Sequence, residues 1–121
     1  MKRVLFVLLS VCSVLLTHAE SQWVEIYRLP AVIYSVDAHI IRTGSTVTYW
    51  VKYYDVKSGQ SDQYPVQLYC NLNLIRFQPL GIYYEKGVKK QIEANTEWSK
   101  MDLSNSNNQF ERNIVCSGGL R

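Results

Sequence analysis

Thr46-Val47-Thr48-Tyr49-Trp50-Val51-Lys52-Tyr53-Tyr54 is the stretch of sequence that decides the fold. Its side chains alternate, so that Val47, Tyr49, Val51 and Tyr53 fall on one face of an extended chain and the residues between them fall on the other. β-Branched and aromatic residues repeating with period two are typical of a strand that is buried on one side. We therefore predict a half-buried antiparallel strand over residues 46–54.

Shorter runs of the same kind lie on both sides of this strand. A turn-rich segment, 57–62, precedes a run from Tyr64 to Asn71 in which Val66, Leu68 and Cys70 share a face, so Cys70 is expected to point toward the core. Pro79 cannot donate a ladder hydrogen bond and indicates a bulge or an edge. Further strands are expected at Trp23–Arg28, Val32–Val36, Ile75–Phe77 and Leu80–Glu85. The chain should form a single antiparallel sheet of about five or six strands.

The pattern changes to a helical one near the C-terminus. Small polar residues that can cap a helix precede Phe110 and Ile114, which are four apart and share a helical face. We predict a short helix over Asn107–Cys116, ended by Ser117-Gly118-Gly119. A helix this short needs tertiary packing to be stable in water. The expected fold class is α+β, mainly β.

The N-terminus has the features of a secretion signal. Lys2 and Arg3 precede an almost wholly apolar run, Val4–Leu16, and Thr17-His18-Ala19 resembles a cleavage site. We predict a signal peptide over residues 1–19 and a single domain over 20–121, exported to the periplasm, the cell surface or the medium. Acylation of Cys12 is an alternative, but Val11 is not the small residue that should precede a lipidated cysteine.

Cleavage would leave two cysteines, Cys70 and Cys116. Export implies an oxidising compartment, in which two remaining cysteines usually form a disulfide. Such a bond would hold the C-terminal helix on the sheet. Catalysis by a free thiol is disfavoured for the same reason.

The charge balance argues against nucleic-acid binding. The chain has 13 Lys and Arg against 10 Asp and Glu, and removal of Lys2 and Arg3 lowers the net charge from +3 to +1. A nucleic-acid-binding domain usually has a strong basic excess.

Residues along nearly the whole exported part carry a family resemblance. They are Trp23, Tyr34-Ser35-Val36-Asp37, Ile41-Arg42-Thr43-Gly44, Val47, Trp50, Cys70, Tyr83-Tyr84, Trp98 and Cys116. In this order they resemble the bacterial surface-adhesin protein E family. The resemblance implies a single antiparallel sheet, a C-terminal helix tethered to its concave face by a disulfide, and a homodimer as one form. It also implies binding to host matrix and serum proteins such as vitronectin, laminin and plasminogen.

Three residues are interpreted as a structural turn. Asp37 follows a strand and can accept backbone N–H bonds, Gly44 can supply a positive φ, and Arg42 is placed to pair with Asp37. His39 is the only histidine after cleavage, and the spacing supplies too few further ligands for a metal. We expect neither a metal nor a cofactor.

A basic cluster beside two tyrosines is the best candidate for a partner-binding patch. It comprises Tyr83, Tyr84, Lys86, Lys89 and Lys90. Rigid aromatic area next to cations suits a protein or an acidic polysaccharide. The simpler interpretation is a solvated hairpin tip whose lysines discourage edge pairing.

Trp98 either covers the core or anchors a partner, and packing against the core is the commoner role of a tryptophan. No serine lies in a nucleophile-elbow pattern, so an enzyme is not expected. A non-enzymatic adhesin-like binding protein is favoured, with a periplasmic envelope module lacking a host ligand as the alternative.

Overall fold

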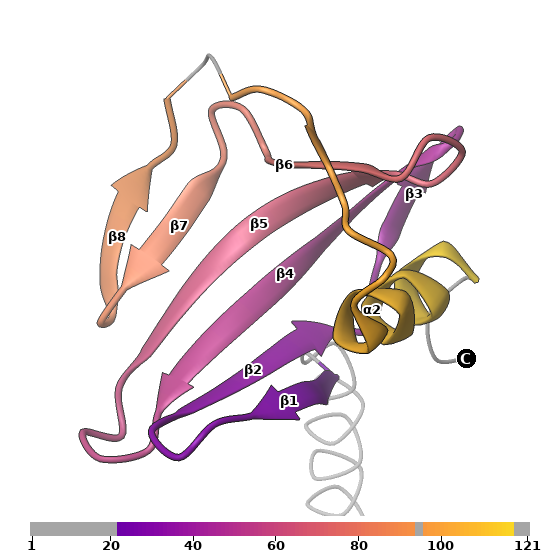
Figure 1. The fold of residues 1–121 in the computed structure, drawn as a ribbon. Helices are drawn as coiled ribbons and strands as arrows, with labels where there is room; N and C mark the ends of the chain where they lie inside the picture. The colour runs from indigo at the N-terminus through magenta and orange to yellow at the C-terminus, as the bar shows by residue number, and fades with distance from the viewer. Residues whose placement is uncertain (1–21, 94–95, 118–121) are drawn as a thin grey trace, which may run out of the picture.

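The protein forms one curved antiparallel sheet with a C-terminal helix on one face (Figure 1). The computed structural model describes residues 22–93 and 96–117. The expected signal peptide, Cys12 and the glycine pair after the helix lie outside the described residues. The mainly β fold with one C-terminal helix is confirmed for the described part of the chain.

Over the described residues the sheet has nine strands, so the expectation of about five or six is wrong. The additional ones are β3, β8 and β9, which contain 3, 4 and 2 residues and lack a recognisable apolar alternation. The strands are β1 Trp23–Arg28, β2 Val32–Asp37, β3 Ile41–Thr43, β4 Thr46–Asp55, β5 Ser61–Tyr69, β6 Leu74–Phe77, β7 Ile82–Glu85, β8 Val88–Gln91 and β9 Ser99–Lys100.

The two long strands β4 and β5 form the centre of the sheet. They pair from Thr46 opposite Tyr69 to Tyr54 opposite Ser61. The free edge of β4 is shared by β3 and β2, and the free edge of β5 is shared by β6 and β7. Figure 1 shows the β7–β8 hairpin and the β1–β2 pair at opposite margins of this centre.

One face of the sheet carries helix α2, and we call it the inner face. The predicted alternation in β4 is confirmed, because Val47, Tyr49 and Val51 are buried on this face together with Val36 of β2. The core continues with Val66 and Leu68 on β5 and with Cys70 just after it. Helix α2 contacts β1 and β4, so much of the inner face extends beyond it.

Helix α2, Ser106–Cys116, packs on the sheet through a face that includes Ile114 of the expected pair but not Phe110. Asn105 caps it by accepting from two backbone N–H groups. Phe110 is 45% exposed, whereas Glu111 and Val115, also four residues apart, are buried. The polar Glu111 can lie inside because tyrosine hydroxyls from the sheet satisfy both of its oxygens.

The predicted disulfide joins Cys70, just after β5, to Cys116 at the end of α2. Two arginines reinforce the same junction. Arg42 of β3 donates to the carbonyl oxygens of Val115 and Cys116, and Arg112 of α2 donates to that of Cys70. The last turn of the helix is therefore fixed both covalently and by charge-assisted hydrogen bonds.

Candidate functional site

A row of aromatic rings crosses the inner face beyond the helix. Tyr34 and Tyr53 have ring centroids 4.9 Å apart, and Tyr53 lies 6.1 Å from Tyr64. Tyr64 in turn lies 5.4 Å from Phe77 and stacks on Tyr83 at 5.3 Å. We call these five side chains and the hollows beside them the tyrosine groove.

Strand register explains why residues so far apart in sequence form one row. Tyr34 of β2 lies directly opposite Tyr53 of β4, and directly opposite residues of an antiparallel pair share a face. Tyr64 pairs with Val51, and Phe77 of β6 pairs with Val66, so both rings share the face of the buried valines. Aromatic pairs of this kind contribute about 0.5–1.5 kcal/mol each beyond area burial.

Two hollows accompany the row and meet at Phe77. The first, of about 340 Å³, lies between Tyr34, Tyr53 and Phe77 on the sheet and residues 96–99 of the segment leading to α2. The second, of about 390 Å³, lies between Phe77, Tyr64, Tyr83 and residues 91–93. Each is within the size range of ligand-binding pockets. Phe77 is 47% exposed and Tyr53 is 38% exposed, so the rings are accessible.

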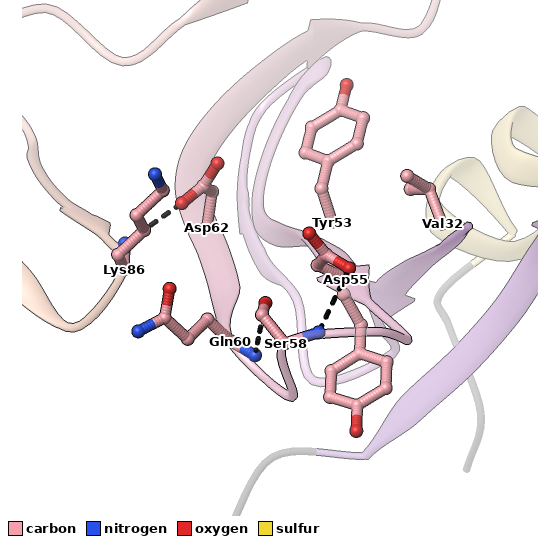
Figure 2. A pocket seen from close by; sticks show the side chains of 8 residues that line it. Val32, Tyr53, Asp55, Ser58, Gln60, Asp62 and Lys86 are labelled. Carbon is pink, nitrogen blue, oxygen red and sulfur yellow. Dashed lines mark hydrogen bonds between the residues drawn. The ribbon is translucent and has the colours of Figure 1, made fainter.

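A third, smaller hollow of about 150 Å³ adjoins Tyr53 at the end of β4 (Figure 2). Asp55 accepts there from the backbone N–H groups of Lys57 and Ser58, and Asp62 accepts from that of Lys86. The hydrogen bonds from Ser58 and Lys57 lower the pKa of Asp55. The acidic side chains that line the three hollows are Asp55, Asp62, Glu85, Glu93 and Glu97.

Tyr53 and Tyr64 of the groove are neutral phenols at neutral pH. Burial raises the pKa of Tyr53, and burial together with the Asp62 and Glu85 carboxylates raises the pKa of Tyr64. Each ring therefore offers an apolar surface and, at its edge, a hydroxyl that can both donate and accept a hydrogen bond.

Beneath the helix, a buried carboxylate forms the inner end of the aromatic row. Glu111 is 3% exposed and accepts from the hydroxyls of Tyr34 at 2.8 Å and Tyr49 at 2.5 Å. Burial raises the pKa of Glu111, and the two phenolic bonds partly oppose that rise. Burial, and then the nearby Glu111, raise the pKa of both tyrosines. The buried Glu111 was not identified from the sequence. The pattern that could have indicated it is the spacing of four between Glu111 and Val115, which places both residues on one helical face.

The structure divides the predicted Tyr83–Lys90 patch between the two faces of the sheet. Tyr83 lies opposite Lys90 and belongs to the groove, whereas Tyr84 lies opposite Lys89 and packs near Trp50 on the other face. Lys90 pairs with Glu85 at 3.2 Å. These residues form the β7–β8 hairpin, whose turn, Lys86-Gly87, has positive φ at both positions, as two-residue hairpins often require.

The three predicted turn residues, Asp37, Arg42 and Gly44, act separately. Asp37 Oδ1 accepts from the backbone N–H groups of His39 and Gln22, and Gly44 has a φ of 62° in the β3–β4 turn. Arg42 does not form the expected pair with Asp37, because its guanidinium reaches the end of α2 instead. Among the described residues, no His, Cys, Asp or Glu cluster could hold a metal ion.

Trp98 combines features of both interpretations made from the sequence. Its indole is half-buried, packs edge-on against Tyr69 and lies under the Arg76 guanidinium at 4.2 Å from the ring centroid. It is not part of the buried core cluster.

No protein-family model, no curated protein and no solved structure matches this chain. Within residues 22–93 and 96–117, no helix is long and apolar enough to cross a membrane.

Proposed function

We propose that the protein is an exported, non-enzymatic binding domain that holds a protein partner in the tyrosine groove. The observation that carries the proposal is the continuous row of accessible rings between two hollows. Tyrosine and phenylalanine are enriched at protein interfaces because they supply large contact area at a small cost in conformational entropy. A segment of a partner protein would lie along this row.

The position of the buried Glu111 carboxyl favours binding over catalysis. Glu111 does not line the groove hollows, and both of its oxygens are bonded to tyrosines under the helix. A general acid or base must reach a substrate atom within hydrogen-bond distance. The groove itself supplies rings, hydroxyls and rim carboxylates, which suit recognition.

The resemblance to surface-adhesin protein E adds a biological setting to this proposal. It supports a location at the cell surface and partners such as vitronectin, laminin or plasminogen. The second setting is the periplasm, where the groove would bind another envelope protein or a second copy of the chain. Both settings depend on the signal peptide expected over residues 1–19.

Two phenylalanines of nearly equal exposure provide a matched test. Phe77 lies in the groove and is 47% exposed, whereas Phe110 lies on α2, outside the groove hollows, and is 45% exposed. Phe77→Ala should weaken binding to immobilised vitronectin or laminin by about 30-fold, the loss typical of an interface anchor. Phe110→Ala should leave it unchanged. Equal affinities for the two variants would contradict the proposed groove.

Location is tested separately by protease treatment of intact and permeabilised cells, read with an antibody against the domain. Digestion on intact cells supports surface display and a host partner. Protection until permeabilisation supports the periplasmic alternative.

A further inference from the structure

The outer face of the sheet, opposite α2, gathers the tryptophans of the chain. Trp50 alternates with the buried Tyr49 and Val51, so it projects from the other side of β4. Trp23 lies against Lys52, which shares the face of Trp50, and Trp98 lies against Arg76. All three indoles are partly buried. This face therefore has the largest aromatic side chains without belonging to the core.

Cations on this face are already stacked on the rings. The Lys52 ammonium lies 4.3 Å from the Trp23 ring centroid, and Arg76 lies at 4.2 Å from that of Trp98. Tyr84 adds a further ring, 6.0 Å from Trp50. Because stacking already restricts these long side chains, they lose less conformational entropy when a ligand binds.

Positive charge predominates on the outer face. Besides Arg28, strand register places four cations there, namely Lys52, Arg76, Lys89 and Lys100, the last two opposite Tyr84 and Leu74. Arg76 also borders the first hollow of the groove. The acidic residues on this side are already engaged. Glu25 pairs with Arg28 at 2.8 Å, and Asp37 is buried and accepts from two backbone N–H groups. The carboxylates that line the hollows belong to the groove.

We propose that the outer face binds an anionic polysaccharide, a linear chain with uronate or sulfate groups. The C–H faces of its sugar rings would pack on Trp50 and Tyr84, and its anions would pair with Lys52 and Lys89. Charge complementarity selects this occupant, and an open sheet face accommodates an extended polymer. Burial lowers the pKa of Lys52 and the Asp37 carboxylate only partly opposes this, so a further anion beside Lys52 would favour its charged form.

The β7–β8 hairpin offers a matched pair of charge variants. Lys52→Gln with Lys89→Gln removes two outer-face cations, whereas Lys86→Gln with Lys90→Gln removes the same charge from the hairpin turn and the inner side. Affinity for heparin and for polygalacturonate would be measured by titration at low salt, with dextran as the uncharged polymer. The outer pair should lose about tenfold in affinity and the inner pair less than about twofold.

Tyr84→Ala provides a second variant that leaves every charge in place. Tyr84 is partly exposed at the sheet surface, so the fold should persist, and unchanged thermal unfolding would verify this. We expect weaker binding to polygalacturonate. Phe77→Ala should keep polysaccharide affinity, which distinguishes this site from the tyrosine groove.

Three results would overturn the inference. Absence of binding to both acidic polymers would refute it, as would equal losses for the two lysine pairs. Tighter binding to single-stranded DNA or to phosphatidylglycerol vesicles than to either polymer would assign the face to a nucleic acid or a membrane instead.

Discussion

Removal of the Cys70–Cys116 disulfide should destabilise the protein by about 4 kcal/mol at 25 °C. The bond joins residues separated by 46 positions, and the chain-entropy relation gives that value for a loop of this length. The perturbation is the double variant Cys70→Ala, Cys116→Ala, in which alanine is small enough to avoid a clash. The total free energy of unfolding of a small domain is about 5–15 kcal/mol, so the expected loss is a large fraction of the stability.

The folded state should keep its architecture without the bond. Arg42 and Arg112 donate to the same junction, and Glu111 holds the middle of α2 on the sheet. The loss should therefore arise mainly in the unfolded chain, which becomes less constrained. Because a less constrained unfolded chain exposes more surface, the urea m-value should rise in the variant.

Urea unfolding followed by circular dichroism measures both quantities. Wild-type protein in excess reductant serves as the control and should match the double variant. A loss below about 1 kcal/mol with an unchanged m-value would refute the reasoning, because the loop would then already be restricted in the unfolded state.

Three further predictions concern single residues. Glu111→Gln should gain stability relative to wild type as pH rises from about 4 to 7, measured by urea unfolding. Because the pKa of Glu111 is raised in the folded state, its contribution to the free energy of unfolding is fully present below the pKa that it has in the unfolded chain. That contribution is lost as the pH rises through the folded-state pKa, so stability curves of variant and wild type that stay parallel over this pH range would contradict the prediction. Leu80→Gly should stabilise by about 1 kcal/mol in thermal unfolding, because Leu80 has a φ of 59° and is 60% exposed; a loss would show that its side chain packs usefully. Gly81→Ala should cost about 1–3 kcal/mol in the same assay, since its Cβ would lie 2.9 Å from Pro65 Cγ; unchanged stability would mean that the turn shifts freely.

Local periodicity was sufficient to predict the centre of the sheet. The alternation over residues 46–54 identifies the buried side of β4, and the run containing Val66, Leu68 and Cys70 does the same for β5. Both strands are long enough for a period of two to be recognised. The disulfide followed from the cysteine count and the inferred compartment.

The short strands could not be predicted from the sequence because they depend on hydrogen bonds to their partner strands. β3, β8 and β9 obtain their hydrogen bonds from β4, β7 and β6, and their residues carry no apolar alternation of their own. Tyr83 and Tyr84 do not form one patch, because neighbouring residues of a strand point to opposite faces. Assigning that segment to a strand should already have divided the patch.

The groove and the Glu111 network depend on contacts that the sequence does not place together. Tyr34 lies 77 positions from Glu111, and Tyr49 lies 62 positions from it. Helical patterning favoured the apolar Phe110 for the buried face. The two hydroxyls reverse that preference, because a buried carboxylate with both oxygens bonded is tolerated.

A single-layer sheet with one short helix cannot cover both of its faces. The packing of α2 against β1 and β4 leaves aromatic rings exposed over the rest of the inner face and over the outer face. Tyrosine and tryptophan tolerate this position because each combines an apolar ring with a polar atom. Five carboxylates line the three hollows together with Lys86 and Arg76, whereas Lys52, Lys89 and Lys100 project from the outer face, so the two faces should select different partners. A domain built in this way could hold a protein segment and an acidic polymer at the same time, with the disulfide and Glu111 keeping the helix fixed beside the groove.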